Sequence, residues 1–211
     1  GRLQLGDQAP LEARDEAARQ FGEFRRWPIR GQNDLFMTIE ERVEGMKEFL
    51  LGSFFAGMML RESPDRLAVD MPKYRTINYG DKRFTVRGIK RAIDGALGSR
   101  GAWMLEPYTD LPSTSGFNTD SLDDVRMIAE LAVKNDYQMA IHAIGDRGNR
   151  EVLNIYEETF RKHPEKNSKE LRWRIEHAQH LNAADIPRFG KLGVIAAMQG
   201  VHCTSDAPYV L

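Results

Sequence analysis

The stretch AIHAIGDRGNREVL, residues 140–153, runs from apolar residues through a histidine and a glycine into an amphipathic segment. Its first part is typical of a buried strand, and its second part is typical of a helix that buries one apolar face. This order predicts a strand–loop–helix joint with His142, Asp146 and Arg147 at its mouth. A histidine in that place is compatible with a structural role or with a ligand-binding role, and the ends of the other strands decide between the two.

Strand-like and helix-like segments alternate on both sides of this joint. Strands are expected at residues 82–93, 137–144, 171–179 and 194–200, and helices at residues 121–135, 149–163 and 183–193. Alternation at this spacing predicts β–α–β units and therefore a parallel sheet in an α/β fold, either doubly wound or closed into a barrel. In both architectures the functional groups gather at the carboxyl ends of the strands.

The first 80 residues have a different character, with helical patterns and no chemical motif. One helix is expected at residues 9–24 and a second at residues 38–60, because apolar side chains recur there at helical spacing. The Pro- and Gly-containing stretch 27–34 separates them. We therefore divide the chain into a mainly helical part, residues 1–80, and a part of βα repeats, residues 81–211.

Basic and imidazole side chains recur where the four expected strands end. The first strand ends near Lys90, the second carries His142, the third carries His177, and the fourth runs into His202. A single strand-end histidine is more often structural than functional. Two histidines at matching positions of consecutive parallel strands favour a metal site, because their side chains converge and imidazole is the commonest metal ligand.

Four long stretches, in this order along the chain, resemble the amidohydrolase superfamily in its YtcJ-like branch (amidohydrolase family 3). They are VRGIKRAIDGALGSRGAWMLEPY (86–108), AIHAIGDRGNREVL (140–153), RIEHAQHL (174–181) and DIPRFGKLGVIAAMQGVHCTSD (185–206). The resemblance covers about residues 83–209. It implies a distorted (β/α)8 TIM-like barrel, of which this chain would supply about strands 4 to 7 and the preceding helices. It also implies a metal-dependent hydrolase that uses metal-activated water on non-peptide C–N bonds of amide-type small molecules.

The resemblance also implies roles for three residues at the strand ends. Lys90 would be carboxylated to a carbamate that bridges two cations, and His142 and His177 would be ligands from the fifth and sixth barrel strands. The cofactor would be a divalent metal, with zinc as the first candidate, bound as one or two ions. Spacing alone would instead make Lys90 a surface lysine beside Arg87 and Arg91.

Three further residues are candidates for orienting the ligands or contacting the substrate. Asp146 and Gln179 could hold the imidazoles by hydrogen bonds, and Asp146 could equally cap the helix that begins near Arg147. His202 could contact the substrate or make a hydrogen bond within its loop. These alternatives stay open on the sequence.

Two parts of the family pattern are absent from the sequence. There is no H-x-H pair of the kind found on the first barrel strand, and Asp206 lies in the loop after the seventh strand rather than on the eighth. The catalytic aspartate is therefore unknown. An incomplete or non-catalytic barrel is one alternative, and a phosphate-binding α/β module that uses GALGSRG (95–101) with Arg100 is a less favoured one.

Composition limits the partners. A formal net charge of −1 gives no general attraction to nucleic acid or to an anionic membrane. The apolar stretch 49–60 is too short to span a bilayer, and Cys203 is the single cysteine. We expect a small-molecule partner, no nucleic acid and no membrane. The sequence is compatible with a homodimer. The location stays open between cytoplasmic and exported, because the chain begins with glycine rather than methionine.

Overall fold

The computed structural model describes residues 56–60, 63–82 and 84–210. The chain divides into two compact units, residues 1–42 and 43–211, and all described residues belong to the second unit. Among them, no helix has both the length and the apolar character needed to cross a membrane.

The second unit is built on one mixed sheet of six described strands. In chain order they are β1 (Ala56–Leu60), β2 (Thr76–Asn78), β3 (Phe84–Ala92), β4 (Gln138–Ala143), β5 (Arg174–His177) and β6 (Ile195–Ala197). The order in space is β1-β3-β4-β5-β6 with parallel neighbours throughout, and β2 pairs with β3 in the antiparallel sense. The predicted α/β fold is confirmed, and so are the four predicted strands, which correspond to β3, β4, β5 and β6.

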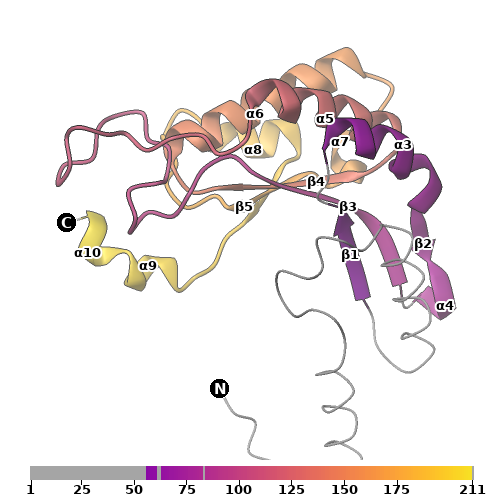
Figure 1. Cartoon of the computed structure of the whole chain (residues 1–211), viewed down its shortest axis with the longest axis horizontal. Helices are drawn as coiled ribbons and strands as arrows, with labels where there is room; N and C mark the ends of the chain where they lie inside the picture. Colours follow the sequence, from indigo (N-terminus) through magenta and orange to yellow (C-terminus); the bar gives the residue numbers. More distant parts are fainter. Residues whose placement is uncertain (1–55, 61–62, 83, 211) are drawn as a thin grey trace, which may run out of the picture. The chain divides into compact units, whose positions relative to one another are not determined.

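Helices follow the strands. They are α3 (Pro64–Tyr74), α4 (Tyr79–Lys82), α5 (Leu122–Lys134), α6 (Asp146–Lys162), α7 (Ser168–Leu171), α8 (Ile186–Leu192), α9 (His202–Ser205) and α10 (Ala207–Val210). Figure 1 shows α5, α6 and α8 on one side of the sheet. Ser121 caps α5 by accepting a hydrogen bond from the Asp124 N–H, and Gly193, at a φ of 70°, ends α8 in the left-handed conformation.

The apolar core lies between the sheet and these helices. On β4, Met139 and Ile141 are fully buried, whereas Gln138 and His142 keep part of their surface exposed. Because successive side chains of a strand point to opposite faces, His142 lies on the face away from the helices. Trp173, just before β5, is also fully buried. The fold therefore separates a packed apolar face from a face that presents polar side chains.

One sequence expectation is wrong. The helix expected over residues 38–60 does not extend to its end, because Ala56–Leu60 is the strand β1. β1 pairs in parallel with β3, from Ala56 opposite Phe84 to Leu60 opposite Ile89. A short apolar run satisfies either structure, and here the hydrogen bonds offered by β3 decide in favour of a strand.

Other expectations for the first 80 residues have different outcomes. The strand β2 was not predicted, and its antiparallel pairing makes the sheet mixed rather than purely parallel. The helix expected at residues 9–24 and the part of the 38–60 helix before residue 56 lie outside the described residues. The division of the chain at residue 80 stays a prediction.

Candidate functional site

Three imidazoles meet at the carboxyl ends of β4 and β5. His142 is the next-to-last residue of β4, and His177 is the last residue of β5, opposite Ala143. The centroids of the two rings are 4.6 Å apart with an edge-on arrangement. The ring of His202, the first residue of α9, lies 5.6 Å from that of His177. The parallel sheet thus brings together the histidines that the sequence placed on successive strands.

The backbone and the surroundings of His177 are unusual. His177 has a φ of 72° and Ala178 a φ of 44°, in the left-handed region that non-glycine residues rarely occupy. Strained conformations of this kind concentrate at functional sites. The Nδ1 atom of His177 lies 2.8 Å from the Gln199 Oε1 atom, which fixes the orientation of the ring.

The electrostatics of the site favour a neutral His177. Burial lowers the pKa of its imidazole, the hydrogen bond to Gln199 opposes this, and electrostatic interaction with His142, His202 and Lys90 lowers it further. A neutral imidazole is the form that binds metals. His177 therefore presents a ring in the state that a metal requires.

Lys90 lies near the end of β3, two residues before its last residue, Ala92. In the parallel register Lys90 is opposite Ala140 and Ala92 is opposite His142. Lys90 and His142 therefore point to the same face of the sheet, because residues two apart on a strand share a face. The positive charge of Lys90 is one of the causes that lower the pKa of His177.

Asp94 belongs to the site, although the sequence analysis gave it no role. It follows β3, and its side chain is fully buried. Its carboxylate accepts hydrogen bonds from the N–H groups of Trp103 at 2.9 Å, Ile144 at 3.0 Å and Gly145 at 2.8 Å. The Oδ1 atom also lies 3.4 Å from the Nε2 atom of His142. One sequence feature could have indicated a role for Asp94. It is an aspartate directly followed by glycine, after the strand that bears Lys90.

The carboxylate of Asp146 binds backbone N–H groups of two segments. Its Oδ1 atom accepts hydrogen bonds from the N–H groups of Leu105 at 2.8 Å and Arg147 at 2.9 Å. It is the first residue of α6, whose N-cap position is taken by Gly145. The Arg147 guanidinium in turn lies 5.1 Å from the ring centroid of Trp103. Asp146 therefore ties the segment after β3 to the start of α6.

Gln179 contacts the segment after β6 rather than an imidazole of the strand ends. Its side-chain amide donates a hydrogen bond to the Asp206 Oδ2 atom. The His180 Nε2 atom lies 3.9 Å from the same oxygen. The hydrogen bond to His177 comes instead from Gln199, a residue that the sequence analysis did not select.

The glycine-containing stretch 95–101 has internal partners for its basic residue. The Arg100 guanidinium forms an ion pair with Asp110 and donates a hydrogen bond of 2.8 Å to the Gly98 carbonyl. An incoming phosphate would have to displace these partners. The contacts weigh against a phosphate-binding loop here.

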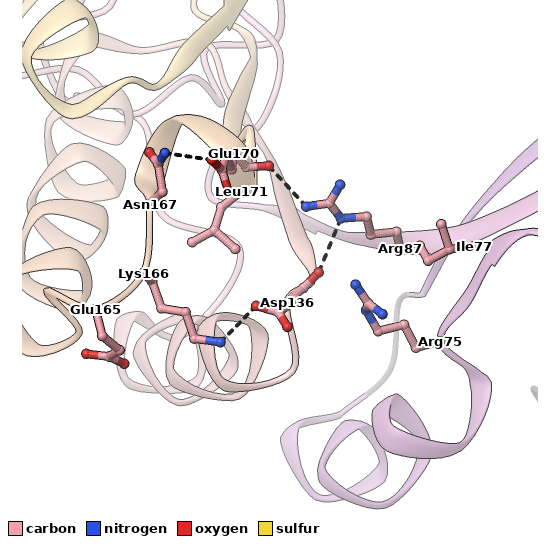
Figure 2. Close-up of a pocket in the computed structure, with 9 residues that line it drawn as sticks. All are labelled: Arg75, Ile77, Arg87, Asp136, Glu165, Lys166, Asn167, Glu170 and Leu171. Carbon is pink, nitrogen blue, oxygen red and sulfur yellow. Dashed lines mark hydrogen bonds and ion pairs between the residues drawn. The ribbon is translucent and has the colours of Figure 1, made fainter.

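A cavity of about 410 Å³ lies at the other end of the strands. It is lined by Arg75, Ile77, Arg87, Asp136, Glu165, Lys166, Asn167, Glu170 and Leu171 (Figure 2). Arg87 donates to the carbonyl oxygens of Asp136 and Glu170, and Lys166 pairs with the Asp136 carboxylate. Asp136 precedes β4, whereas His142 lies at its carboxyl end. The cavity is therefore separate from the imidazole cluster.

The family follows from a match of residues 55–210 to the model of the amidohydrolase family. The chain belongs to this family. This confirms the resemblance inferred from the sequence motifs.

Two curated relatives of this amidohydrolase chain match it over 123 residues, which is 58% of the chain. The protein LONG AFTER FAR-RED 3 of Arabidopsis thaliana is 38% identical, and the match covers 21% of its length. The protein named "Putative amidohydrolase YtcJ" of Bacillus subtilis (strain 168) is 36% identical, and the match covers 22% of its length. The matched part thus spans about a fifth of each relative.

Two solved structures are similar to the amidohydrolase chain over 82% of its length. They are uncharacterized metal-dependent hydrolases from Pyrococcus horikoshii OT3, with 27% identity, and from Pyrococcus furiosus, with 26% identity. The TM-score is 0.60 for both, and the match covers 40% and 41% of those chains. The chain is thus similar to less than half of two proteins that are described as metal-dependent hydrolases.

The described residues fit such a metal in part. His142 and His177 come from neighbouring strands, and within the described part of the chain the Nε2 atom of His142 is buried without a hydrogen-bond partner. No group of three or more His, Cys, Asp or Glu side chains with the arrangement of a metal site occurs among residues 56–60, 63–82 and 84–210. The two imidazoles therefore supply part of a ligand set that, for zinc, typically has four members.

Proposed function

We propose that this protein is a hydrolase that cleaves non-peptide C–N bonds of amide-type small molecules by means of metal-activated water. The observation that carries the proposal is the approach of His142 and His177, whose ring centroids are 4.6 Å apart at the carboxyl ends of adjacent parallel strands. In barrel enzymes the catalytic groups come from this end of the strands. The proposal includes a barrel in which β3, β4, β5 and β6 correspond to strands 4 to 7.

In this proposal each residue of the site has its own role. His142 and His177 hold the metal, for which zinc is the first candidate, as one or two ions. When bound, such a metal lowers the pKa of a water ligand to about 7 and polarises the substrate carbonyl. Lys90, on the same face as His142, would react as the neutral amine with carbon dioxide and, with loss of a proton, would supply a carbamate as an anionic ligand. Gln199 holds the His177 ring in place.

The remaining candidates act around this centre. Asp146 and Gln179 stabilise the loops that frame it through their hydrogen bonds with Leu105 and Asp206. His202 contacts the substrate in this proposal, and the distance of 5.6 Å between its ring and that of His177 supports this role. The proposed partners are a small molecule and, for assembly, a second copy of the chain, with no nucleic acid and no membrane.

A non-catalytic barrel portion is the second candidate function. It is favoured by the absence of an H-x-H pair in the sequence. All five histidines lie among the described residues, so none is left elsewhere in the chain to complete a ligand set. Such a protein would fold and bind partners without hydrolysing a substrate.

Replacing the two histidines separates these functions. We expect His142→Ala and His177→Ala, made in the full-length protein, to lower the bound metal and the hydrolysis of N-acyl substrates together, because each removes a metal ligand. The matched control is His163→Ala, since His163 pairs with Glu130 and Glu165 away from the cluster. Elemental analysis and an activity assay provide the measurements. Full metal content in both variants would assign the histidines a structural role.

A further inference from the structure

The carboxylate of Asp94 is the point where three segments of the chain meet. Its Oδ2 atom accepts from the N–H groups of Trp103 and Gly145, and its Oδ1 atom accepts from the N–H of Ile144. Trp103 belongs to the segment after β3, whereas Ile144 and Gly145 form the joint between β4 and α6. A fully buried carboxylate is costly unless hydrogen bonds compensate for its lost hydration, and three N–H groups do so here.

The surroundings of this carboxylate are shaped to accept it. Gly148, in the first turn of α6, faces the Oδ2 atom, and a Cβ atom at that position would lie 2.8 Å from the oxygen. The opposite side of the carboxylate faces His142, whose Nε2 atom is 3.4 Å from Oδ1. This nitrogen is buried, and no described residue, Asp94 included, makes a hydrogen bond with it in the observed ring position. Asp94 is thus the acceptor available to a proton on Nε2.

The number of donors explains why the residue is an aspartate. Three backbone N–H groups converge on its two oxygens, and a protonated Nε2 atom would be a fourth donor. An ionised carboxylate is an acceptor at every lone pair, whereas an asparagine in its place would turn an NH2 group towards one of these donors. A proton on Nε2 leaves the lone pair of the ring on Nδ1, because a neutral imidazole carries one proton.

We propose that Asp94 is a positioning residue, which holds the His142 ring with its Nε2–H towards the carboxylate and so presents the Nδ1 lone pair to the metal. The part that concerns the metal rests on the proposed function. The part that concerns the proton does not, and it is tested without metal. A partner of this kind fixes both the tautomer and the orientation of a ligating histidine.

The first test locates the proton on the His142 ring. In the metal-free, full-length protein labelled with 15N-histidine, NMR at a pH where the ring is neutral distinguishes the two tautomers. We expect the Nε2–H form in the wild type and a shift towards the Nδ1–H form in Asp94→Asn, in which the side-chain amide can donate to Nε2. An Nδ1–H ring in the wild type, or the same tautomer in both proteins, would overturn the proposal.

The second test compares zinc affinity in competition with a chelator. Asp94→Asn should weaken zinc binding about 10- to 100-fold, the usual effect of removing a partner that orients a ligand. The matched control is Asn149→Ala, because the Asn149 amide donates to the carbonyl oxygens of Ala143, Gly145 and His180 at the same joint. We expect the control to lower the melting temperature and leave the zinc affinity within about threefold of the wild type. Equal losses of affinity in the two variants would reduce Asp94 to a structural role and overturn the proposal.

Two further outcomes keep this inference distinct from the proposed function. Complete loss of zinc in Asp94→Asn, as large as in His142→Ala, would make Asp94 a ligand itself and would also overturn the positioning role. Unchanged zinc binding in His142→Ala would refute the metal assignment of the proposed function, while the NMR comparison would still decide where Asp94 holds the proton.

Discussion

Lys90 is the residue for which the proposed chemistry makes the strongest demand. An ammonium group has no lone pair and repels cations, so a site with two metals at Lys90 needs a carbamate or another anion there. We expect Lys90→Ala, in the full-length metal-loaded protein, to lose the second ion and most of the activity, and short carboxylic acids to restore part of both by filling the vacated bridge. Elemental analysis and an activity assay with and without acetate measure this. A fully active variant with two ions bound would leave Lys90 as one more basic residue beside Arg91.

Gly145 is required by the closeness of two backbones. A Cβ atom on Gly145 would lie 2.0 Å from the carbonyl oxygen of Trp103. Gly145→Ala should therefore force the segment after β3 away from α6 and lower the free energy of unfolding by about 1–3 kcal/mol, as overpacking does. Gly190→Ala in α8 is the control, because an added Cβ there would have no atom within 4 Å apart from its chain neighbours and the backbone of its own helix. We expect the control to be neutral or to stabilise by about 0.5–1 kcal/mol, with urea unfolding as the measurement for both.

Individual site residues differed in how far the sequence revealed them. His142 and His177 were predictable because a local pattern places each at the end of a strand, and parallel strands end at one edge. Asp94 and Gln199 were not, because each acts through a contact distant in sequence. Asp94 and Ile144 are 50 residues apart, and Gln199 and His177 are 22 residues apart. Contacts of that kind depend on the register of the strands, which the sequence pattern does not specify.

A buried tyrosine joins the helix α3 to the start of the strand β4. Tyr137, just before β4, is fully buried, and its hydroxyl donates a hydrogen bond of 2.9 Å to the Met71 carbonyl of α3. Burial raises the pKa of Tyr137 to about 12. The unfolded chain, with an ordinary tyrosine pKa of about 10, loses the proton first. Stability is therefore lost as the pH rises from about 10 through about 12, by up to about 2–3 kcal/mol for this group.

Tyr137→Phe tests this linkage. The variant should be about 1 kcal/mol less stable than the wild type near pH 8, because it loses the hydrogen bond to Met71. It should lose less further stability than the wild type when the pH rises to 11, because phenylalanine has no proton to lose. Urea unfolding at both pH values measures the difference. Equal losses in the two proteins would show that Tyr137 does not titrate in this range.

Among the helices and strands, the clarity of the apolar pattern decided which ones the sequence could predict. α5 and α6 have clear apolar faces and lie close to the residues expected for them. β1 lacks such a pattern, since an apolar run of five residues fits a strand or a buried helix equally well. Its identity comes from β3, which pairs with it, so the deciding information is tertiary.

For the whole molecule, the parallel order of the sheet explains how one chain concentrates its imidazoles. β4 and β5 end at the same edge, so His142 and His177 meet although the helices α6 and α7 separate them in sequence. The described residues do not by themselves complete a zinc site of the usual kind. Zinc in hydrolases typically takes three protein ligands and a water, and the described residues hold no group of three or more side chains arranged for a metal.

We therefore expect the isolated 211-residue chain to hydrolyse N-acyl substrates slowly or not at all, even with added zinc. Two imidazoles provide fewer ligands than a catalytic zinc needs, so zinc should bind weakly and be removed by a mild chelator. Equilibrium dialysis with zinc and an assay of the same sample measure both quantities. Stoichiometric zinc together with turnover at ordinary enzyme rates would mean that this chain supplies the remaining ligands itself, from side chains other than His142 and His177. It would also rule out the non-catalytic alternative, since a barrel portion without a complete site cannot activate water.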